Sequence, residues 1–252
     1  MAASRGNLAN REGLQNRIFA GKLDQIERQY TNFWNVPCAA ADIEAYEKRI
    51  TGHQYGGLDK WIKATTPFTD WQLNPVNEGK ALAYNRHCLL IGNHSSFDVV
   101  QYPENPAQAG MSMIHILGIP RENLFNGVSL GFDNVCIIWR LICLFKVEWR
   151  RPQFRQAVLE HQRRAIESRN NAAPDDARLE VAASHWRELQ SMINLITEDD
   201  FAFGLHLWPD NSIGHLHLHI IATPEIFRRY STLAHDEKTK DALEVVGHVL
   251  SR

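Results

Sequence analysis

The pattern of apolar and polar positions in the 252-residue chain changes near residue 81. Residues 10–30 are mostly polar and carry apolar residues at a weak helical spacing, which predicts an exposed helical arm. Residues 41–50 predict a second helix, because the segment runs into Gly52 and glycine suits a helix C-terminus. The first 80 residues are therefore expected to form a helical extension.

Short apolar runs after this point predict strands. The runs at 88–91 and 97–102 flank the turn-forming residues 92–96, so an antiparallel hairpin is expected there. A further strand is predicted within residues 111–119, where His115 shares one face with alternate apolar residues. This part of the chain is therefore expected to build a sheet.

A long helical region follows and then strands return. Pro152 and residues 170–174 interrupt the helical region. The helices predicted on this basis are 135–149, 153–169 and 175–197. Strands are predicted at 201–207 and 214–221, and a last helix from about residue 236 to 250. This order predicts an α+β fold, an antiparallel sheet packed with helices.

Composition and charge narrow the class of protein. With 44% hydrophobic and 22% charged residues, the chain has the composition of a soluble globular protein. Its net charge of −2 offers no attraction to polymeric nucleic acid, so any nucleotide that it binds is expected to be small. The four cysteines form no CxxC pair, which indicates neither a disulfide framework nor a structural zinc site.

No membrane association is expected. The longest apolar stretch, residues 135–145, contains Arg140 and is about half as long as the roughly 20 residues that span a bilayer. The first residues lack the apolar run of a secretory signal. These features predict a cytoplasmic or nuclear protein.

The run HLHLHII at residues 215–221 holds the main candidates for functional residues in the sequence. On a strand, His215, His217 and His219 would line one side while the intervening residues enter the core. A buried imidazole needs hydrogen-bonding partners. A neutral imidazole is also accessible near pH 7, because its ordinary pKa is about 6.5, and it can attack phosphorus while its neighbours stabilise charge.

Two other interpretations of the run stay open at this point. Two histidines at i and i+2 can share a zinc or iron ion with a ligand from elsewhere, although the next carboxylate, Glu225, follows a break at Thr223-Pro224. The three histidines could instead be solvated on an exposed face. We expect neither a metal nor another cofactor.

The run resembles the signature of the histidine-triad (HIT) superfamily, in which three histidines alternate with apolar residues, at all seven positions. Asn211 and Ser212 resemble the polar pair that many members place before the triad to contact phosphate. Residues 114–121 are similar to the strand that ends in the family's His-x-Leu-Val-Ile-Pro-Lys type motif. The resemblance covers roughly residues 85–222.

The resemblance implies a HIT-like domain over residues 81–225 with a helical insertion near 128–170. Residues 1–80 would be the N-terminal helical extension, and residues 226–252 would provide a C-terminal helix. The 175–197 helix would take the place of the family's main helix. Because members are often dimers, a homodimer is one expected assembly.

The resemblance also assigns roles. His217 would be the nucleophile, His215 would fix its orientation, His219 would contact phosphate or the leaving group, and Ser212 would donate to a phosphate oxygen. At Gly204 many nucleotide-hydrolysing members carry asparagine, so this sequence departs from them.

Three further residues are candidates for substrate binding. His115 and His206 could reach the site or be satisfied core histidines, and Trp208 could stack on a base or anchor the core. The run LHLWP at residues 205–209 is similar to the approach to the triad in scavenger mRNA decapping enzymes.

The leading hypothesis is a nucleotide hydrolase or nucleotidyl transferase that uses a histidine nucleophile on a phosphoanhydride, phosphoramidate or cap-like bond. One alternative is an enzyme of the same fold that performs histidine acid–base chemistry on a non-nucleotide metabolite. The other is a non-catalytic nucleotide-binding protein. In each case the expected partner is a small, nucleotide-like or otherwise anionic molecule.

Overall fold

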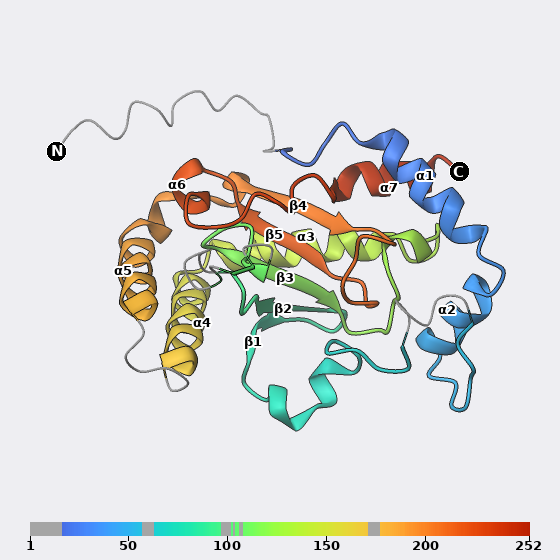
Figure 1. Ribbon diagram of the computed structural model, residues 1–252, viewed down its shortest axis with the longest axis horizontal. Helices are drawn as coiled ribbons and strands as arrows, with labels where there is room; N and C mark the ends of the chain where they lie inside the picture. Colours follow the sequence, from blue (N-terminus) through green and yellow to red (C-terminus); the bar gives the residue numbers. More distant parts are fainter. Residues whose placement is uncertain (1–16, 57–62, 97–101, 103, 106–107, 171–176) are drawn as a thin grey trace.

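The computed structural model describes residues 17–252 except 57–62, 97–101, 103, 106–107 and 171–176. Within these residues the chain has the expected α+β fold, with six strands in one antiparallel sheet of order β1-β2-β3-β5-β4-β6 (Figure 1). The strands are β1 (Ala81–Tyr84), β2 (Cys88–Gly92), β3 (His115–Pro120), β4 (Phe201–His206), β5 (Leu218–Ala222) and β6 (Thr239–Asp241). The helices are α1 (Leu23–Trp34), α2 (Ala39–Glu47), α3 (Cys136–Trp149), α4 (Pro152–Asn170), α5 (Ala177–Met192), α6 (Glu225–Arg228) and α7 (Ala242–Leu250).

Helix α3 covers one face of the sheet, where it packs against β2 and β3 (Figure 1). A Cβ atom at Gly118 of β3 would lie 3.2 Å from Leu141 of α3, so the missing side chain lets the helix approach the strand closely. Helix α5 packs on α4 instead. Helix α3, rather than the helix predicted at 175–197, therefore packs its apolar face against β2 and β3.

The opposite face of the sheet carries the histidines. The register pairs His219 of β5 with Leu117 of β3 and with Gly204 of β4, and paired residues in an antiparallel sheet share a face. His115, two residues before Leu117, lies on the same face. This face is therefore the one on which the predicted chemistry can act.

The N-terminal segment is not an exposed arm as far as the structure describes it. Phe19 and Ile26 are fully buried, and the hydroxyl of Tyr30 donates to the carbonyl of Gly127. Helix α1 lies beside α7, which brings the two ends of the described chain together (Figure 1). The apolar stripe of α1 continues to Phe33, beyond the window in which the arm was predicted.

Close packing also explains the glycine at position 204. A Cβ atom there would lie 2.3 Å from the side chain of Thr239 and 2.8 Å from the ring of Phe19. An asparagine cannot occupy this position without moving β6 or the N-terminal segment. The glycine at this position therefore has a local structural cause.

The predicted hairpin is wrong in its pairing. Strand β2 pairs with β1 on one side and β3 on the other, so both of its edges are occupied. The proposed partner at 97–102 lies outside the described residues except for Tyr102, which is not in a strand. Local turn residues were the basis of the prediction, and they do not reveal which strands pair.

Several helices begin or end at other residues than the sequence predicted. Helix α2 ends at Glu47, before the left-handed residue Arg49, rather than at Gly52. The helix expected from residue 236 begins at Ala242, because the preceding residues form the edge strand β6. Helices α3, α4 and α5 lie close to the predicted ranges.

Two sequence-based expectations can be compared directly with the described residues. No helix among them is both long enough and apolar enough to cross a membrane. Cys88 is buried, whereas Cys136 and Cys143 are exposed on α3, and none of these three forms a disulfide.

We predict that Phe19→Ala lowers the free energy of unfolding by about 3–5 kcal/mol, because it empties a fully buried site that packs on the histidine-bearing face. The neighbouring Ile18 is 40% exposed, so Ile18→Ala serves as the control and should cost less than about 1 kcal/mol. Urea unfolding of both variants measures the difference. Equal midpoints would show that the N-terminal segment does not stabilise the sheet.

Candidate functional site

The triad lies at the entry to β5 and is buried. His219 belongs to the strand, whereas His215 and His217 lie in the segment that leads into it. Their exposed fractions are 1% for His215 and 6% for each of the other two. The interpretation as solvated surface histidines is therefore wrong, and each ring must satisfy its donors and acceptors inside the protein.

The ring of His217 is held by the backbone of its neighbour. Its Nδ1 lies 2.7 Å from the carbonyl oxygen of His215. Since a carbonyl only accepts, Nδ1 must carry the proton and donate it, which leaves the lone pair on Nε2. Phe68 packs edge-on against this ring, with centroids 5.4 Å apart. His217 is thus held with an unprotonated ring nitrogen, Nε2.

A chain of hydrogen bonds fixes the proton on His219. The backbone N–H of Ser95 donates to Asn93 Oδ1 at 3.0 Å, so the Asn93 amide presents Nδ2 to His115 Nδ1, also at 3.0 Å. The Met111 N–H donates to the same ring nitrogen at 3.3 Å. His115 must then carry its proton on Nε2, which lies 2.9 Å from His219 Nδ1.

The hydrogen bond from His115 determines which nitrogen of His219 carries the proton. Because Nδ1 accepts from His115, the neutral ring carries its proton on Nε2. This nitrogen is buried and has no hydrogen-bond partner among the residues that the structure describes. The ring centroids of His217 and His219 are 4.9 Å apart. The lone pair of His217 Nε2 and the N–H donor of His219 Nε2 therefore lie on adjacent rings.

The N-terminal region completes the site. The hydroxyl of Tyr46 on α2 lies 2.7 Å from His215 Nδ1 and 2.9 Å from the hydroxyl of Thr69. Burial raises the pKa of Tyr46, so its hydroxyl stays protonated. Phe68 packs against both His215 and His217. Sequence reasoning missed Tyr46 and Phe68, because no local pattern joins them to a triad far along the chain.

The other predicted site residues divide into two groups. His206 belongs to the histidine cluster: its ring lies 4.1 Å from that of His219, and its Nε2 donates to the Thr239 hydroxyl. Asn211 is buried and donates to the carbonyl of Ile213, whereas Ser212 is exposed. Trp208 packs edge-on against Phe33 in the apolar core.

Burial keeps the histidine cluster neutral. Loss of solvation lowers the pKa of His115 and of His215 to about 3, and it lowers the pKa values of His206, His217 and His219 from their ordinary value. Repulsion from neighbouring rings adds to this effect for every one of these residues except His217. Neutral rings at pH 7 are what the tautomer assignments require.

A cavity of about 530 Å³ lies near the histidine cluster and shares wall residues with its surroundings, although none of His115, His215, His217 and His219 lines it. Phe68, Leu117 and Asn93 belong both to its wall and to the surroundings of the histidines. Trp71 and Ile91 add apolar surface, and Lys80, His161 and Arg164 add polar groups. Cavities of this size bind ligands such as a nucleotide.

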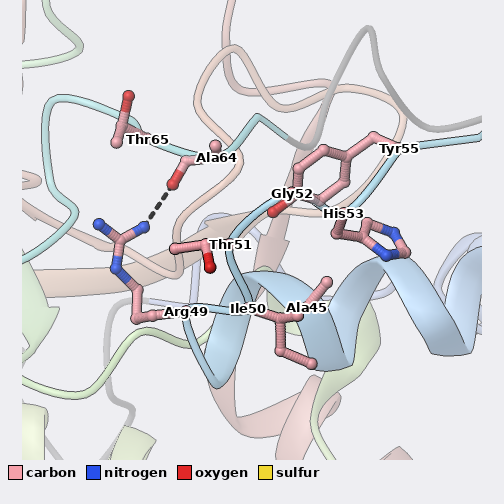
Figure 2. Close-up of a pocket in the computed structure, with 9 residues that line it drawn as sticks. All are labelled: Ala45, Arg49, Ile50, Thr51, Gly52, His53, Tyr55, Ala64 and Thr65. Atoms are coloured by element: carbon pink, nitrogen blue, oxygen red, sulfur yellow. Dashed lines mark hydrogen bonds between the residues drawn. The ribbon is translucent and has the colours of Figure 1, made fainter.

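A second hollow of about 380 Å³ lies away from the triad, at the C-terminal end of α2 (Figure 2). The side chain of Arg49 donates to the Ala64 carbonyl and pairs with Asp70 at 3.1 Å. His53 is paired with the buried Asp42 at 2.7 Å. These polar groups therefore hold the loop after α2, and none of the predicted site residues lies there.

We predict that acid destabilises the protein within the histidine range. A histidine with a lowered folded pKa takes up its proton more readily when unfolded, so its stabilising contribution is complete above about pH 6.5 and declines below it. The decline is at most about 1.4 kcal/mol per pH unit for each such residue.

Urea unfolding at pH 7.5, 6.5, 5.8 and 5.2 measures this decline before most carboxylates begin to titrate. A free energy of unfolding that does not change over this interval would contradict neutral burial of the cluster.

No protein family model matches the chain, and no curated protein matches it either. Among the described residues, no group of three or more His, Cys, Asp or Glu side chains has an arrangement that could hold a metal ion. The geometry of the histidine cluster is therefore the basis for assigning a function.

Proposed function

We propose that this chain is a HIT-like nucleotide hydrolase or nucleotidyl transferase in which Nε2 of His217 attacks phosphorus. The bond cleaved is a phosphoanhydride, a phosphoramidate or a cap-like linkage. The observation that carries the proposal is the hydrogen bond from His217 Nδ1 to the His215 carbonyl, which leaves Nε2 as a free nucleophilic lone pair.

The reaction proceeds in two displacements. In the first, His217 Nε2 forms a bond to phosphorus, and the bond from phosphorus to the leaving group breaks with its electron pair. The Nε2–H of His219 donates a hydrogen bond to a phosphoryl oxygen and so stabilises its charge. In the second, water attacks phosphorus, His217 departs as a neutral imidazole, and the proton that water releases neutralises the leaving group.

The side chains that line the cavity suit a substrate with a planar organic group and an anionic end. Phe68, Trp71 and Leu117 offer flat and apolar surface, while Lys80 and Arg164 contribute positive charge. Among the residues that the structure describes, none of those lining the cavity carries a carboxylate. A nucleotide meets both requirements, because its base can pack on apolar surface and its phosphate is anionic.

A metal centre fits the cluster less well. A histidine binds a metal through a ring lone pair, and the lone pair of His219 accepts the hydrogen bond from His115. His217 keeps a lone pair on Nε2, because its Nδ1 donates to a carbonyl, but His219 has no lone pair left to share an ion with it. Nucleophilic chemistry uses both rings in the states that these hydrogen bonds impose.

We predict that His217→Ala abolishes turnover, whereas Ser212→Ala reduces it by roughly 10- to 150-fold at most. The first change removes the covalent route, and the second removes at most one hydrogen bond to a charged oxygen. Rates are compared on dinucleoside polyphosphates, adenosine phosphoramidates and cap analogues, after equal melting temperatures have been confirmed.

Mass spectrometry of quenched reactions should detect a phosphorylated or nucleotidylated protein that is absent from the His217 variant. Near-full activity in that variant would refute the nucleophile. Binding without turnover in wild-type protein, detected as a thermal shift with the same panel, would favour the non-catalytic alternative. Turnover confined to compounds without phosphorus would favour the acid–base alternative.

A further inference from the structure

Asn93 occupies a position shared by the cavity and the histidine cluster. Its side chain lines the cavity and donates to His115 Nδ1. Its own backbone N–H donates to the His115 carbonyl at 3.1 Å, so main chain and side chain both hold it against β3. The amide is oriented by Ser95, whose N–H donates to Oδ1.

We propose that Asn93 is a positioning residue that fixes the proton of His219 on Nε2 by acting through His115. It thereby makes His219 a hydrogen-bond donor toward a bound phosphoryl oxygen. This inference deepens the proposed function, on which the role of His219 in the reaction rests. The placement of the proton itself is independent of any substrate.

The reason lies in the hydrogen-bonding capacity of each ring. A neutral imidazole carries one proton, so a donor at one nitrogen forces the proton to the other. With an acceptor at position 93, His115 would be drawn to carry its proton on Nδ1 and to accept at Nε2. His219 would then donate from Nδ1, and its Nε2 would present a lone pair that repels a phosphoryl oxygen.

The surrounding groups keep both rings neutral and leave the choice to the hydrogen bonds. His217, His235 and Arg228 face His115, and all of them oppose a positive charge on its ring. His206 also faces His219 and has the same effect there. The Met111 N–H supports the same tautomer as Asn93, but at 3.3 Å rather than 3.0 Å.

The test is Asn93→Asp, which replaces the donor with an acceptor of nearly the same shape. Long-range proton–nitrogen NMR of histidine-labelled protein at pH 7.5 reports which ring nitrogen of His115 and of His219 carries a proton. Wild-type protein should show Nε2–H on both rings. The variant should show His219 protonated on Nδ1, and kcat should fall by about 10²-fold while KM changes little.

Asn77→Asp is the matched control, because Asn77 lines the same cavity but donates to the Trp71 carbonyl and not to a histidine. It introduces the same charge into the same cavity, and the tautomers of both histidines should stay as in wild-type protein. If Asn93→Asp does not fold, Asn93→Ala decides the question, because it removes the donor without adding charge. A measurable population of His219 Nδ1–H is then expected.

Unchanged wild-type tautomers in every folded Asn93 variant would overturn the inference. Because the NMR measurement needs no substrate, it distinguishes this failure from failure of the proposed function. Correct tautomers with no covalent intermediate at His217 would refute the proposed function and leave the role of Asn93 intact.

Discussion

The need to satisfy buried imidazoles is the constraint on which the rest of the structure depends. His115, His206, His215, His217 and His219 lie together on one face of the sheet, and none is more than 6% exposed. Once buried, each neutral ring must find an acceptor for its proton or leave it unpaired at a cost. The partners that the protein supplies determine which nitrogens remain for chemistry.

Each partner comes from a different part of the chain. The carbonyl of His215 fixes His217, the Asn93 amide acts on His219 through His115, and Tyr46 bonds to His215. The segments that carry these groups must all be in place before the rings have defined tautomers. The helices before β1 are therefore part of the site as well as of the fold, because α2 carries Tyr46.

The fold class and the helical segments could be predicted from the sequence because they depend on local periodicity. Helices α3, α4 and α5 show apolar spacing interrupted by proline, and the runs around β3 and β4 alternate. The edge strand β6 could not be predicted in this way. Its residues Thr239, Lys240 and Asp241 show no apolar alternation, although all three are buried by packing against other parts of the chain.

The residues of the candidate site also divide into those that a local motif reveals and those that only the folded chain brings together. The triad is a local motif and stands out at once, whereas Tyr46 is 169 residues away from the histidine that it contacts. The tautomers depend on such distant contacts, so no reading of the motif could assign them. Trp208 lies beside the turn before the triad, and the sequence left open whether it stacks on a base or anchors the core; its ring packs edge-on against Phe33.

We propose that the hydrogen bond from His217 Nδ1 to the His215 carbonyl leaves His217 Nε2 as the nucleophile toward phosphorus. A crystal structure with orthovanadate and a nucleoside tests it most directly, because vanadium adopts the geometry of phosphorus under attack. The account predicts a bond from vanadium to His217 Nε2, a vanadate oxygen within hydrogen-bonding distance of His219 Nε2, and the nucleoside in the cavity beside Phe68. Vanadate bound through another residue, with His217 Nε2 uninvolved, would contradict it.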